Sequence, residues 1–407
     1  MKDVLIIGGG PAGMSAAVCA AEMGERVLLL ERMDRVGKKL LATGNGRCNL
    51  MNSGAWRYPR GESLAKAVLS RCGAEAQRRF WRELGLTLRE EAEGRVYPAS
   101  GQASTVLDVL RLAMARRGVQ VVTGAGVTAL CRTDAGWEAA AGGTVYPAKR
   151  VIAAAGGCAQ PALGSDGSVF PLLEKLGVAL EPRSPVLTQI RTEGKPIAGL
   201  SGIRVRAEVG VLRGGRRIHR ETGELLFTDY GVSGVCAMQC ASFAEGGELS
   251  LNLLPALGLD STQALLEILR GRRDRWPATE AAQLWVGLAL PRVAQALHRQ
   301  AGVDTGRRSL REIRDDELAR LAAVCGDFRL RVTGLRGFES AQVTRGGVAA
   351  NEVRPDTLGH RRLPGLHIAG EALDVDGDCG GFNLMFAFAT GILSGMNTEE
   401  GKTAWIL

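Results

Sequence analysis

Six residues near the start of the chain, GGGPAG at positions 8 to 13, have the composition and spacing of a phosphate-binding turn. A short apolar run, residues 4–7, precedes them, and a helix-compatible segment follows. A second apolar run, residues 26–30, ends directly before the acidic residue Glu31. Within about 30 residues, the order is strand, glycine turn, helix, strand and acid. This order distinguishes a dinucleotide site from an ordinary glycine-rich turn. The segment therefore predicts a dinucleotide-binding βαβ unit.

Each glycine of the GxGxxG pattern has a different part in this prediction. Gly8 makes the tight turn, Gly10 lets the backbone approach a pyrophosphate, and Gly13 allows the helix to lie against the strand. The start of the helix presents free N–H groups and the positive end of its dipole to the phosphates. We expect cofactor contacts from the whole turn, including Pro11 and Ala12.

The acid at the end of the second strand narrows the choice of nucleotide. Glu31 is placed to accept hydrogen bonds from a ribose diol, and the next residue, Arg32, is expected to contact the cofactor as well. A 2′-phosphate beside Glu31 would bring two negative charges together. The bound nucleotide is therefore predicted to be an unphosphorylated one, FAD or NAD.

The far end of the chain favours a flavin. Residues 366–369 read as a strand, Gly370 and Glu371 as a turn, and Gly380-Gly381 as the opening of a helix over residues 382–394. Backbone N–H groups at such a helix start stabilise the negative charge of a reduced flavin at its N1/C2=O edge. The alternative is a tightly packed core helix. Both can hold, because one stripe has core spacing: Leu384, Ala387, Phe388 and Gly391.

The segment GNGRCN at residues 44–49 is physically suited to form a second cradle for the cofactor. Gly44 and Gly46 permit close approach of the backbone. Cations and amides for the diphosphate, the ribityl chain or the flavin edge come from Lys38, Lys39, Arg47, Asn45 and Asn49. For the two lysines, a solvated pair is an equally good interpretation.

Cys48 is predicted to be a packed thiol rather than half of a redox pair. Disulfide reductases with such a first domain carry two nearby cysteines, but the next cysteine in this chain is Cys72. The nine cysteines contain no CxxC motif and no metal-ligand spacing, so no metal is expected. Unpatterned cysteines in a chain of this size suit a reducing cytoplasm.

These segments resemble those of the aminoacetone-oxidase-like FAD-binding enzymes, a group that includes a bile-acid ene-reductase and lies within the glutathione-reductase-type flavoproteins. The resemblance covers nearly the whole chain. Besides GGGPAG and GNGRCN, it is carried by GRVYPAS at 94–100, VTRGGVAANEV at 343–353 and GEALDVDGDCGGFN at 370–383. GNGRCN and the final GGFN are specific to this group, whereas the first motif occurs in every Rossmann-like FAD protein.

The resemblance implies that the first motif holds the FAD pyrophosphate and that the last lies under the flavin ring. Implied FAD contacts, besides the residues of the first motif with Glu31 and of GNGRCN, are Gly370, Glu371, Asp374, Gly380, Gly381, Phe382, Asn383 and Leu384. Further contacts are expected at Val127 and Gly347. Ala155 and Gly156 belong to a segment that resembles the Ala-Thr-Gly turn of these flavoproteins.

Two segments depart from the pattern of this group. After the turn at residues 154–157 the group usually has aromatic and hydroxyl residues, whereas this chain has Cys158-Ala159-Gln160-Pro161. At an FTH-like segment the chain has Phe227-Thr228-Asp229, with aspartate in place of histidine. Both segments are candidates to line the substrate cavity, so the departures bear on the choice of substrate.

Because the two parts of the FAD site lie at opposite ends of the chain, we predict an α/β fold with a discontinuous Rossmann-like FAD-binding domain. This domain comprises residues 1–185 and 345–407. Alternating strand patterns between Gly-rich turns predict an inserted β-barrel over 186–257 and 326–344. Helical patterns predict a small helical subdomain over 258–325.

The insertion can be divided further. Asp260 is predicted to cap a helix through Leu269, and further helical segments lie near 279–290, 292–300 and 315–325. The segments 328–332 and 341–343 read as strands that return to the barrel.

Length and charge exclude several classes of function. The 407 residues with 45% apolar content suffice for two or three cores. The net charge of +8 comes from 51 basic and 43 acidic residues spread along the chain, so no nucleic-acid partner is expected. No run of 18 apolar residues occurs, and glycines with Pro11 interrupt the N-terminal apolar run, so neither a membrane span nor a signal peptide is predicted.

The main functional hypothesis is a flavin-dependent reductase that passes hydride to an activated C=C of a small apolar, enone-type substrate such as a steroid or bile acid. The insertion has no second strand-GxGxxG-helix unit, so either NAD(P)H stacks directly on the flavin or electrons arrive from another donor. One alternative is an oxidase or dehydrogenase of a small amine or alcohol. Another is a non-catalytic or RNA-associated flavoprotein.

Reduction of an activated C=C needs a proton donor opposite the hydride and a cation or N–H group near the carbonyl. Tyr97, Asp229 and Tyr230 are candidate donors, and Arg345, in the glycine-flanked segment TRGG, is the candidate clamp. Each could instead be a plain surface or packing residue. We expect substrate to enter between the flavin face and the inserted barrel, beyond the carboxyl ends of the strands.

Overall fold

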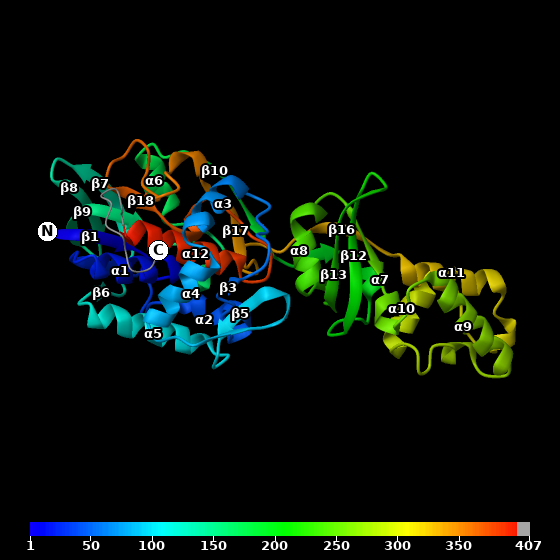
Figure 1. Cartoon of the computed structure of the whole chain (residues 1–407). Coiled ribbons are helices and arrows are strands. Elements are labelled where there is room, and N and C mark those ends of the chain that lie inside the picture. Colours follow the sequence, from blue (N-terminus) through cyan, green and yellow to red (C-terminus); the bar gives the residue numbers. More distant parts are fainter. Residues whose placement is uncertain (397–407) are drawn as a thin grey trace. The chain divides into compact units, whose positions relative to one another are not determined.

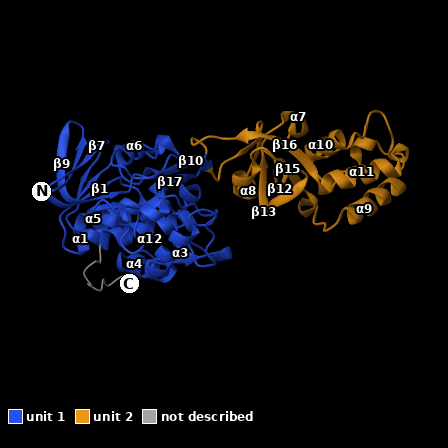
Figure 2. Ribbon diagram, turned by 90° about the horizontal axis from the view of Figure 1, so that it is seen from above, with its two compact units in different colours: residues 1–185, 341–407 blue, residues 186–340 orange. Residues whose placement is uncertain are grey.

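The computed structural model describes residues 1–396 and divides the chain into two compact units (Figure 2). Unit 1 comprises Met1–Pro185 and the described residues from Ala341 on, and unit 2 comprises Val186–Ser340. Each unit has its own hydrophobic core. The expected fold class is confirmed: a Rossmann-type α/β domain, a closed antiparallel barrel and helical elements.

The elements of both units are labelled in Figure 1. The strands of unit 1 are β1 (Lys2–Ile7), β2 (Val27–Leu30), β3 (Met51–Asn52), β4 (Leu88–Glu90), β5 (Arg95–Pro98), β6 (Gln120–Val122), β7 (Val127–Thr133), β8 (Gly136–Ala141), β9 (Thr144–Ala153), β10 (Leu180–Val186), β17 (Val343–Val348) and β18 (Leu366–Ile368). Its helices are α1 (Pro11–Glu22), α2 (Lys38–Ala42), α3 (Glu62–Arg71), α4 (Ala74–Glu83), α5 (Ala103–Arg116), α6 (Phe170–Lys175) and α12 (Phe382–Met396).

Unit 2 contains both strands and α-helices. Its strands are β11 (Ile190–Thr192), β12 (Arg204–Arg213), β13 (Arg216–Phe227), β14 (Gly231–Ser233), β15 (Glu248–Asn252) and β16 (Phe328–Leu335). Its helices are α7 (Gly194–Ile197), α8 (Val235–Ala244), α9 (Thr262–Arg275), α10 (Pro291–Ala301) and α11 (Asp315–Gly326).

The main sheet of unit 1 brings the ends of several strands to one edge. Its order is β6-β2-β1-β9-β8-β7, and β18 pairs with β9. The strands β6, β2, β1, β18 and the second half of β9 run parallel to one another. Their last paired residues, Val122, Leu30, Ile7, Ala153 and Ile368, are level in the register. The segments that follow these residues therefore gather at the carboxyl edge of the sheet.

Helices α1 and α12 lie side by side in unit 1 (Figure 1) and touch through their backbones. A Cβ added at Gly391 would lie 2.2 Å from Ser15 Oγ and 2.3 Å from the Ala12 carbonyl oxygen. A Cβ at Gly395 would lie 2.5 Å from the Ala16 carbonyl oxygen. Because successive glycines of α12 meet successive turns of α1, the two helices run in the same direction. Their N-termini therefore point the same way.

The barrel of unit 2 is closed. Its strand order is β11-β14-β13-β12-β15-β16, and β11 also pairs with β16. Alternate residues of β16, Phe328, Leu330 and Val332, face the core, as expected for a sheet with one solvated face. Helices α9, α10 and α11 contribute to the same core.

One strand prediction and one helix prediction for the insertion are wrong. Residues 341–343 do not return to the barrel, because Val343 begins β17, which pairs with β10 in unit 1. The segment 279–290 forms only a short 3-10 helix, η5 (Ala281–Gln283), flanked by turns. Three of its apolar side chains, Ala281, Leu284 and Trp285, are buried in the core although the segment forms no α-helix.

The cap of α9 also differs from the prediction. Ser261, rather than Asp260, occupies the N-cap position, and its Oγ accepts a hydrogen bond of 3.1 Å from the Ala264 N–H. Both residue types are good N-caps, so sequence alone does not separate neighbouring candidates. The helix continues to Arg275, beyond the predicted end at Leu269.

The contact between α1 and α12 gives a first prediction. Gly391→Ala should lower the free energy of unfolding by roughly 1–3 kcal/mol, because the added methyl group overlaps backbone that cannot move aside. Urea unfolding of the purified variant measures this change.

Gly271→Ala is the matched control. Gly271 lies inside α9, and a Cβ there meets nothing within 4 Å, so alanine should be neutral or stabilise by up to about 1 kcal/mol. Equal effects of the two substitutions would contradict the close approach of α1 and α12.

Candidate functional site

Three turns meet at the carboxyl edge of the main sheet in unit 1. The Gly8 N–H donates to the Leu30 carbonyl at 2.8 Å, and the Ala154 N–H donates to the Ile7 carbonyl at 2.9 Å. The Ala369 N–H donates to the Ala153 carbonyl at 3.0 Å. These bonds join the turn after β1 to the turns after β9 and β18, so both ends of the chain contribute to one site.

The three glycines of the first turn have different surroundings. Gly8 has φ +105°, and a Cβ there would lie 2.6 Å from the Ala154 carbonyl oxygen. A Cβ at Gly13 would lie 1.9 Å from the Gly8 carbonyl oxygen, so only glycine lets α1 begin so close to β1. Gly10 has φ −81°, and a Cβ there meets nothing within 4 Å. The open space beside Gly10, at the N-cap of α1, suits an anionic group.

Glu31 is buried beside this turn and makes two hydrogen bonds to the backbone. Its Oε2 accepts from the Gly9 N–H at 2.7 Å, and its Oε1 accepts from the Met33 N–H at 2.7 Å. Each carboxylate oxygen keeps a second lone pair, so the side chain can still accept from two hydroxyl groups of a ribose.

Arg32 and the segment before Val127 lie close to Glu31. Arg32 forms an ion pair with Asp166. Val127 begins β7 directly after the segment 124–126, which is bonded to the backbone around Glu31: the Ala125 N–H donates to the Glu31 carbonyl at 2.9 Å.

Glu371 connects the two ends of the chain through side-chain contacts. Its Oε2 lies 2.6 Å from Lys39 Nζ, and its Oε1 accepts from the Thr344 N–H at 2.9 Å. Lys38, by contrast, pairs with the exposed Asp34 at 2.5 Å. Lys39 therefore contacts the segment after β18, whereas Lys38 pairs with a residue of its own segment, and contact of either lysine with the cofactor stays a prediction.

The turn after β9 and strand β17 are tied together at the same place. Thr344 Oγ1 accepts from the Cys158 N–H at 2.8 Å and from the Ala159 N–H at 3.0 Å. Gly347 has φ +118°, and a Cβ there would lie 2.5 Å from the Ala372 carbonyl oxygen. Strand β17 thus fits closely between the turns that follow β9 and β18.

The GNGRCN segment has an unusual backbone. Its residues with positive φ are Gly44 (57°), Asn45 (55°), Gly46 (82°) and Cys48 (57°). For a residue other than glycine this conformation costs on the order of 1–3 kcal/mol, and such strain clusters at functional sites. Arg47 pairs with Glu91 at 2.6 Å, and its guanidinium carbon lies 4.2 Å from the centre of the Tyr97 ring.

Acidic residues hold the loop between β18 and α12 in place. Asp374 accepts from the Gly346 N–H at 3.0 Å and from Arg60 Nε at 2.7 Å. Asp376 is 3% exposed and accepts from Arg345 Nε at 3.0 Å and Nη2 at 2.8 Å.

The start of α12 is fixed by two amide side chains. The Asn383 amide bonds both the N–H and the carbonyl of Gly377, at 2.8 and 2.7 Å. Asn52 Nδ2 donates to the Gly380 carbonyl at 2.9 Å. Phe382 packs edge-to-face against Tyr58, with ring centres 5.9 Å apart, and Leu384 is partly buried against the core.

Two buried polar atoms of this site have no hydrogen-bond partner among residues 1–396. One is Asn49 Oδ1, which lies 2.8 Å from a Cβ position at Gly381. The other is Ser165 Oγ, 2.9 Å from a Cβ position at Gly156. A buried acceptor or hydroxyl left without a partner costs about 1–3 kcal/mol, so both atoms fit a site completed by a polar ligand.

Ser165 was not predicted to belong to the site. It follows the turn Ala155-Gly156 by several residues, and only the folded loop brings its hydroxyl back to Gly156. The short turn sequence Gly164-Ser165-Asp166-Gly167 was the signal that marked this return.

Cys48 has the surroundings of a packed thiol. Its side chain is 0% exposed within the core of unit 1, and burial raises the pKa of the thiol to about 12. A thiol with this pKa is not ionised at neutral pH and is a poor nucleophile.

The candidate proton donors fall into different units. Tyr97 lies on β5 in unit 1, beside Gly44 and Arg47. Asp229 and Tyr230 lie in unit 2, in the turn between β13 and β14. Tyr230 stacks against Arg336, whose guanidinium carbon is 5.1 Å from the ring centre.

Over residues 1–396, no cluster of three or more His, Cys, Asp or Glu side chains is arranged to hold a metal ion. Within the same range, none of the helices combines the length and apolarity needed to cross a bilayer.

One family model and two relatives match nearly the whole chain. Residues 2–397 match the HI0933-like protein Rossmann domain. A 3-dehydro-bile acid delta(4,6)-reductase from Clostridium scindens is 34% identical, and the alignment covers 98% of this chain and 100% of that protein. A ribosomal RNA dihydrouridine synthase from Escherichia coli is 28% identical over 95% of this chain and 96% of that protein.

A solved structure has a similar fold. The 3-ketosteroid-delta4-(5alpha)-dehydrogenase from Rhodococcus jostii RHA1, determined with 4-androstene-3,17-dione, superposes with a TM-score of 0.50 at 17% identity. The match covers 98% of this chain and 96% of that one. At this identity the likeness concerns the fold alone.

Gly10→Val tests the phosphate-binding turn. Valine fits the local φ of −81° and the open space, so the variant should fold normally but lose FAD, because the side chain occupies the phosphate position. Far-ultraviolet circular dichroism and flavin absorbance of the purified protein report the two properties separately. A folded variant with full flavin absorbance would refute the assignment of Gly10.

Cys48→Ser tests the packed-thiol interpretation. The variant should keep its flavin and most of its activity, while the free energy of unfolding falls by about 1–3 kcal/mol, the cost of burying a hydroxyl group. Loss of a thiolate–flavin charge-transfer band, or of all turnover at unchanged flavin content, would show that Cys48 has a redox role.

Proposed function

The chain belongs to the HI0933-like family of FAD-binding Rossmann-domain proteins, and we propose that this FAD-dependent oxidoreductase reduces an activated C=C bond of a small apolar substrate. The resemblance inferred from the GNGRCN and GGFN segments is thereby confirmed at the level of the family. The observation that carries the proposal is the full-length 34% identity to a bile-acid delta(4,6)-reductase. An enone or dienone of a steroid or bile acid is accordingly the proposed substrate class.

The residues of unit 1 fit an FAD molecule. The N–H groups at the start of α1, beside Gly10, would hold the pyrophosphate, and Glu31 would accept from the ribose. The unpartnered Asn49 Oδ1, close to Gly381, suits the N3–H donor of a flavin ring at the start of α12. Bound FAD would supply a hydride from its N5 atom.

Arg345 is the proposed clamp for the substrate carbonyl. Its Nε and Nη2 are engaged by Asp376, and the side chain is 27% exposed, so Nη1 keeps hydrogen atoms for a further acceptor. The buried carboxylate fixes the guanidinium plane, which would hold the cation in place as negative charge develops on a carbonyl oxygen. The proposed candidates for the proton donor are still Tyr97, Asp229 and Tyr230.

NAD(P)H is the proposed electron donor. Unit 2 is a barrel with helices and contains no parallel strand-turn-helix unit of its own. A nicotinamide would therefore have to meet the flavin directly rather than from a separate nucleotide domain, which makes direct hydride transfer the step to measure.

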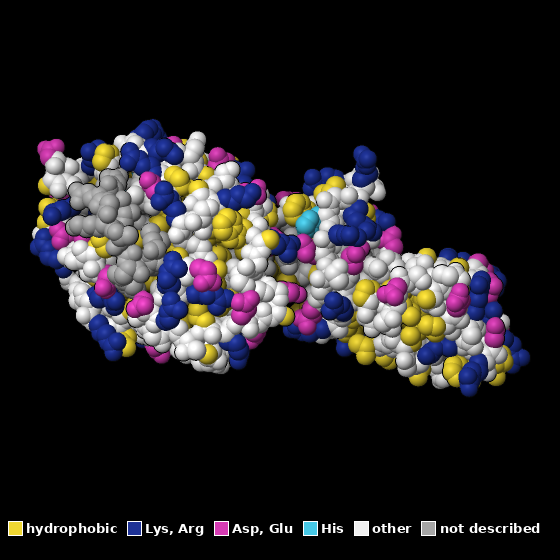
Figure 3. Space-filling view, viewed as in Figure 1, with side chains coloured by type: hydrophobic (Ala, Val, Ile, Leu, Met, Phe, Trp, Pro, Cys, Tyr) yellow, Lys and Arg dark blue, Asp and Glu magenta, His cyan; other side chains and the backbone are white. Residues whose placement is uncertain are grey.

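Ribosomal RNA is the second candidate substrate. The relatives named ribosomal RNA dihydrouridine synthases also saturate a C=C bond, that of a uridine, and they match nearly the whole chain. Against RNA, Lys and Arg side chains on the face shown in Figure 3 are interspersed with Asp and Glu rather than gathered in one stripe. The sequence-based expectation of no nucleic-acid partner therefore stays a prediction to be tested.

Anaerobic stopped-flow measurement of the purified yellow protein tests the proposal. NADH or NADPH should bleach the flavin rapidly, and a 3-oxo-Δ4 or 3-oxo-Δ4,6 steroid should restore the flavin absorbance without oxygen. Recovery with unmodified ribosomal RNA but not with steroid would favour the second candidate. Bleaching by an amine or alcohol instead of NAD(P)H would favour the oxidase alternative, and no reduction by any donor would refute catalysis.

Substitution of the Arg345–Asp376 pair tests the clamp. Removing Arg345 alone would leave a buried carboxylate unpaired, so the double variant Arg345→Met/Asp376→Asn is preferable. Flavin content should be unchanged, while turnover falls by roughly 10²-fold, as for loss of an oxyanion donor.

Arg57→Ala is the matched control. Arg57 pairs with Asp378 of the same loop at 2.7 Å but is not proposed to touch substrate, so turnover should stay within a few fold of the wild type. Normal turnover of the double variant would make the Arg345–Asp376 pair a purely structural one.

A further inference from the structure

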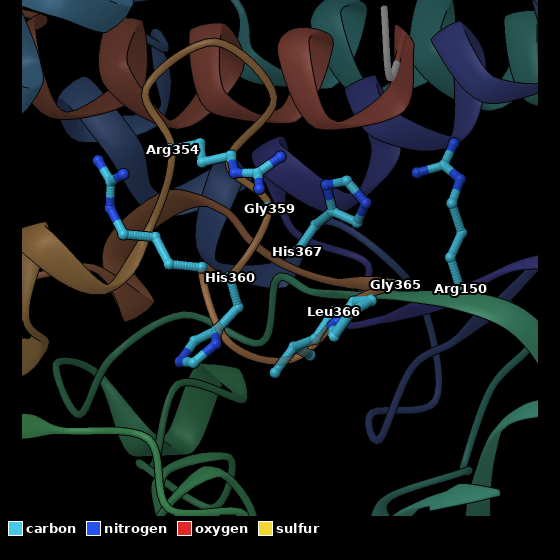
Figure 4. Close-up of a pocket in the computed structure, with 9 residues that line it drawn as sticks. Arg150, Arg354, Gly359, His360, Gly365, Leu366 and His367 are labelled. Atoms are coloured by element: carbon cyan, nitrogen blue, oxygen red, sulfur yellow. The ribbon is translucent and has the colours of Figure 1, made fainter. Parts of the chain in front are cut away.

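A cavity of about 270 Å³ lies in unit 1 at the amino-terminal end of β18 (Figure 4). Arg150, one of the residues that line it, pairs with Glu25, so its charge is balanced within the chain. The cofactor turns follow the opposite, carboxyl end of the strand. Ligands of open α/β sheets bind beyond the carboxyl ends of the strands, so the residues that meet a substrate are expected there, beside Gly380-Gly381.

The loop of residues 53–56 is hydrogen-bonded at both ends to the segment that precedes α12. At one end, Asn52 Nδ2 donates to the Gly380 carbonyl at 2.9 Å, and Asn52 Oδ1 accepts from the Gly54 N–H at 2.8 Å. At the other end, the Asp378 N–H donates to the Arg57 carbonyl at 3.0 Å. The loop therefore lies directly beside Gly380-Gly381, the place proposed for the flavin ring.

The residues that follow this loop hold it in place. Tyr58 is buried, and its Oη donates to the Phe382 carbonyl at 2.8 Å. A Cβ added at Gly377 would lie 3.0 Å from Cε1 of the Tyr58 ring, so the two segments are closely packed. The Asp376 N–H donates to the Arg60 carbonyl at 3.3 Å. The loop is thus fixed relative to the start of α12.

Trp56 is the large apolar residue of this loop. It is 38% exposed, and the residues before it, Ser53, Gly54 and Ala55, are small and exposed as well. An indole ring offers a wide apolar face and loses little conformational freedom when a ligand packs against it. An exposed tryptophan on a fixed loop beside the proposed flavin position is therefore suited to bind an apolar ring.

The arginines that follow Trp56 already have carboxylate partners. Arg57 pairs with Asp378 at 2.7 Å, and Arg60 pairs with Asp374 at 2.7 Å and with Glu181 at 3.1 Å. Nucleic acids are bound largely through contacts of cations with phosphates, and the charges of these two arginines are balanced within the chain. The loop therefore suits a neutral ring system better than a nucleotide.

We propose that the indole of Trp56 packs against the fused apolar rings of the substrate, on the part of the molecule that extends beyond the reacting C=C bond. This inference rests on the proposed function. Apolar burial and ring packing at Trp56 add to substrate affinity, whereas the reacting bond lies at the flavin. Trp56 therefore determines how tightly a multi-ring substrate is held, not how fast a bound substrate is reduced.

Equilibrium dialysis of a neutral 3-oxo-Δ4 steroid against the oxidised, flavin-containing protein tests the proposal. Trp56→Ala should raise the Kd of the steroid roughly tenfold at unchanged flavin content, whereas Trp56→Phe, which keeps an aromatic ring, should stay within about threefold of the wild type. Trp276→Ala is the matched control. Trp276 is 48% exposed at the end of α9 in unit 2, and its substitution should leave the Kd unchanged.

Reoxidation of the reduced flavin by saturating steroid separates this inference from the proposed function. Its rate in Trp56→Ala should stay within about threefold of the wild type, because only rings remote from the reacting bond lose a contact. Steroid binding that depends on Trp56, without reoxidation, would support the inference and refute the proposed reaction. An unchanged Kd in Trp56→Ala, no steroid binding by the wild type, or weaker binding of ribosomal RNA alone in Trp56→Ala would overturn the inference.

Discussion

The close contact between α1 and α12 is the constraint on which the candidate site depends. These helices belong to opposite ends of the sequence, and they touch through Gly391 and Gly395 of α12 and through the carbonyls of Ala12 and Ala16 of α1. Because they run in the same direction, their N-termini open toward the same side of unit 1. Each helix contributes the positive end of its dipole there, and the pairing of β18 with β9 brings the Gly370-Glu371 turn to the same edge.

Ion pairs and amide hydrogen bonds then hold in place the segments that α1 and α12 bring together. The loop before α12 carries Asp374, Asp376 and Asp378, and each has an arginine partner from another segment: Arg60, Arg345 and Arg57. Two of these carboxylates, Asp374 and Asp376, are almost fully buried, so removing either arginine partner would leave a buried carboxylate unpaired. This loop is thereby held as a rigid support in front of Gly380-Gly381. A flavin ring beside Gly380-Gly381 would therefore contact backbone N–H groups whose orientation is fixed.

Local chemistry made part of this arrangement predictable. The sequence alone predicted the different conformational roles of Gly8, Gly10 and Gly13 and the position of the acid Glu31. These follow from the local geometry of a strand, a turn and a helix. The pairing of Lys39 with Glu371 and the bidentate contact of Arg345 with Asp376 could not be predicted, because each joins residues distant in the chain. Ser165 was missed although it lies close to Gly156 in the chain, because the path of the loop between them could not be predicted. Distance along the chain also explains the misplaced strand at 341–343, whose partner β10 is far away in the sequence. The cap of α9 was misassigned for a different reason, because the adjacent residues Asp260 and Ser261 are both good N-caps.

A crystal structure with FAD bound tests most directly the claim that the two ends of the chain form one flavin site. The account predicts the pyrophosphate within hydrogen-bond distance of the backbone N–H groups at the start of α1, and the isoalloxazine ring beside Gly381 with its N3–H donating to Asn49 Oδ1. A flavin ring bound away from Gly380 and Gly381, with Asn49 Oδ1 still unpartnered, would contradict it.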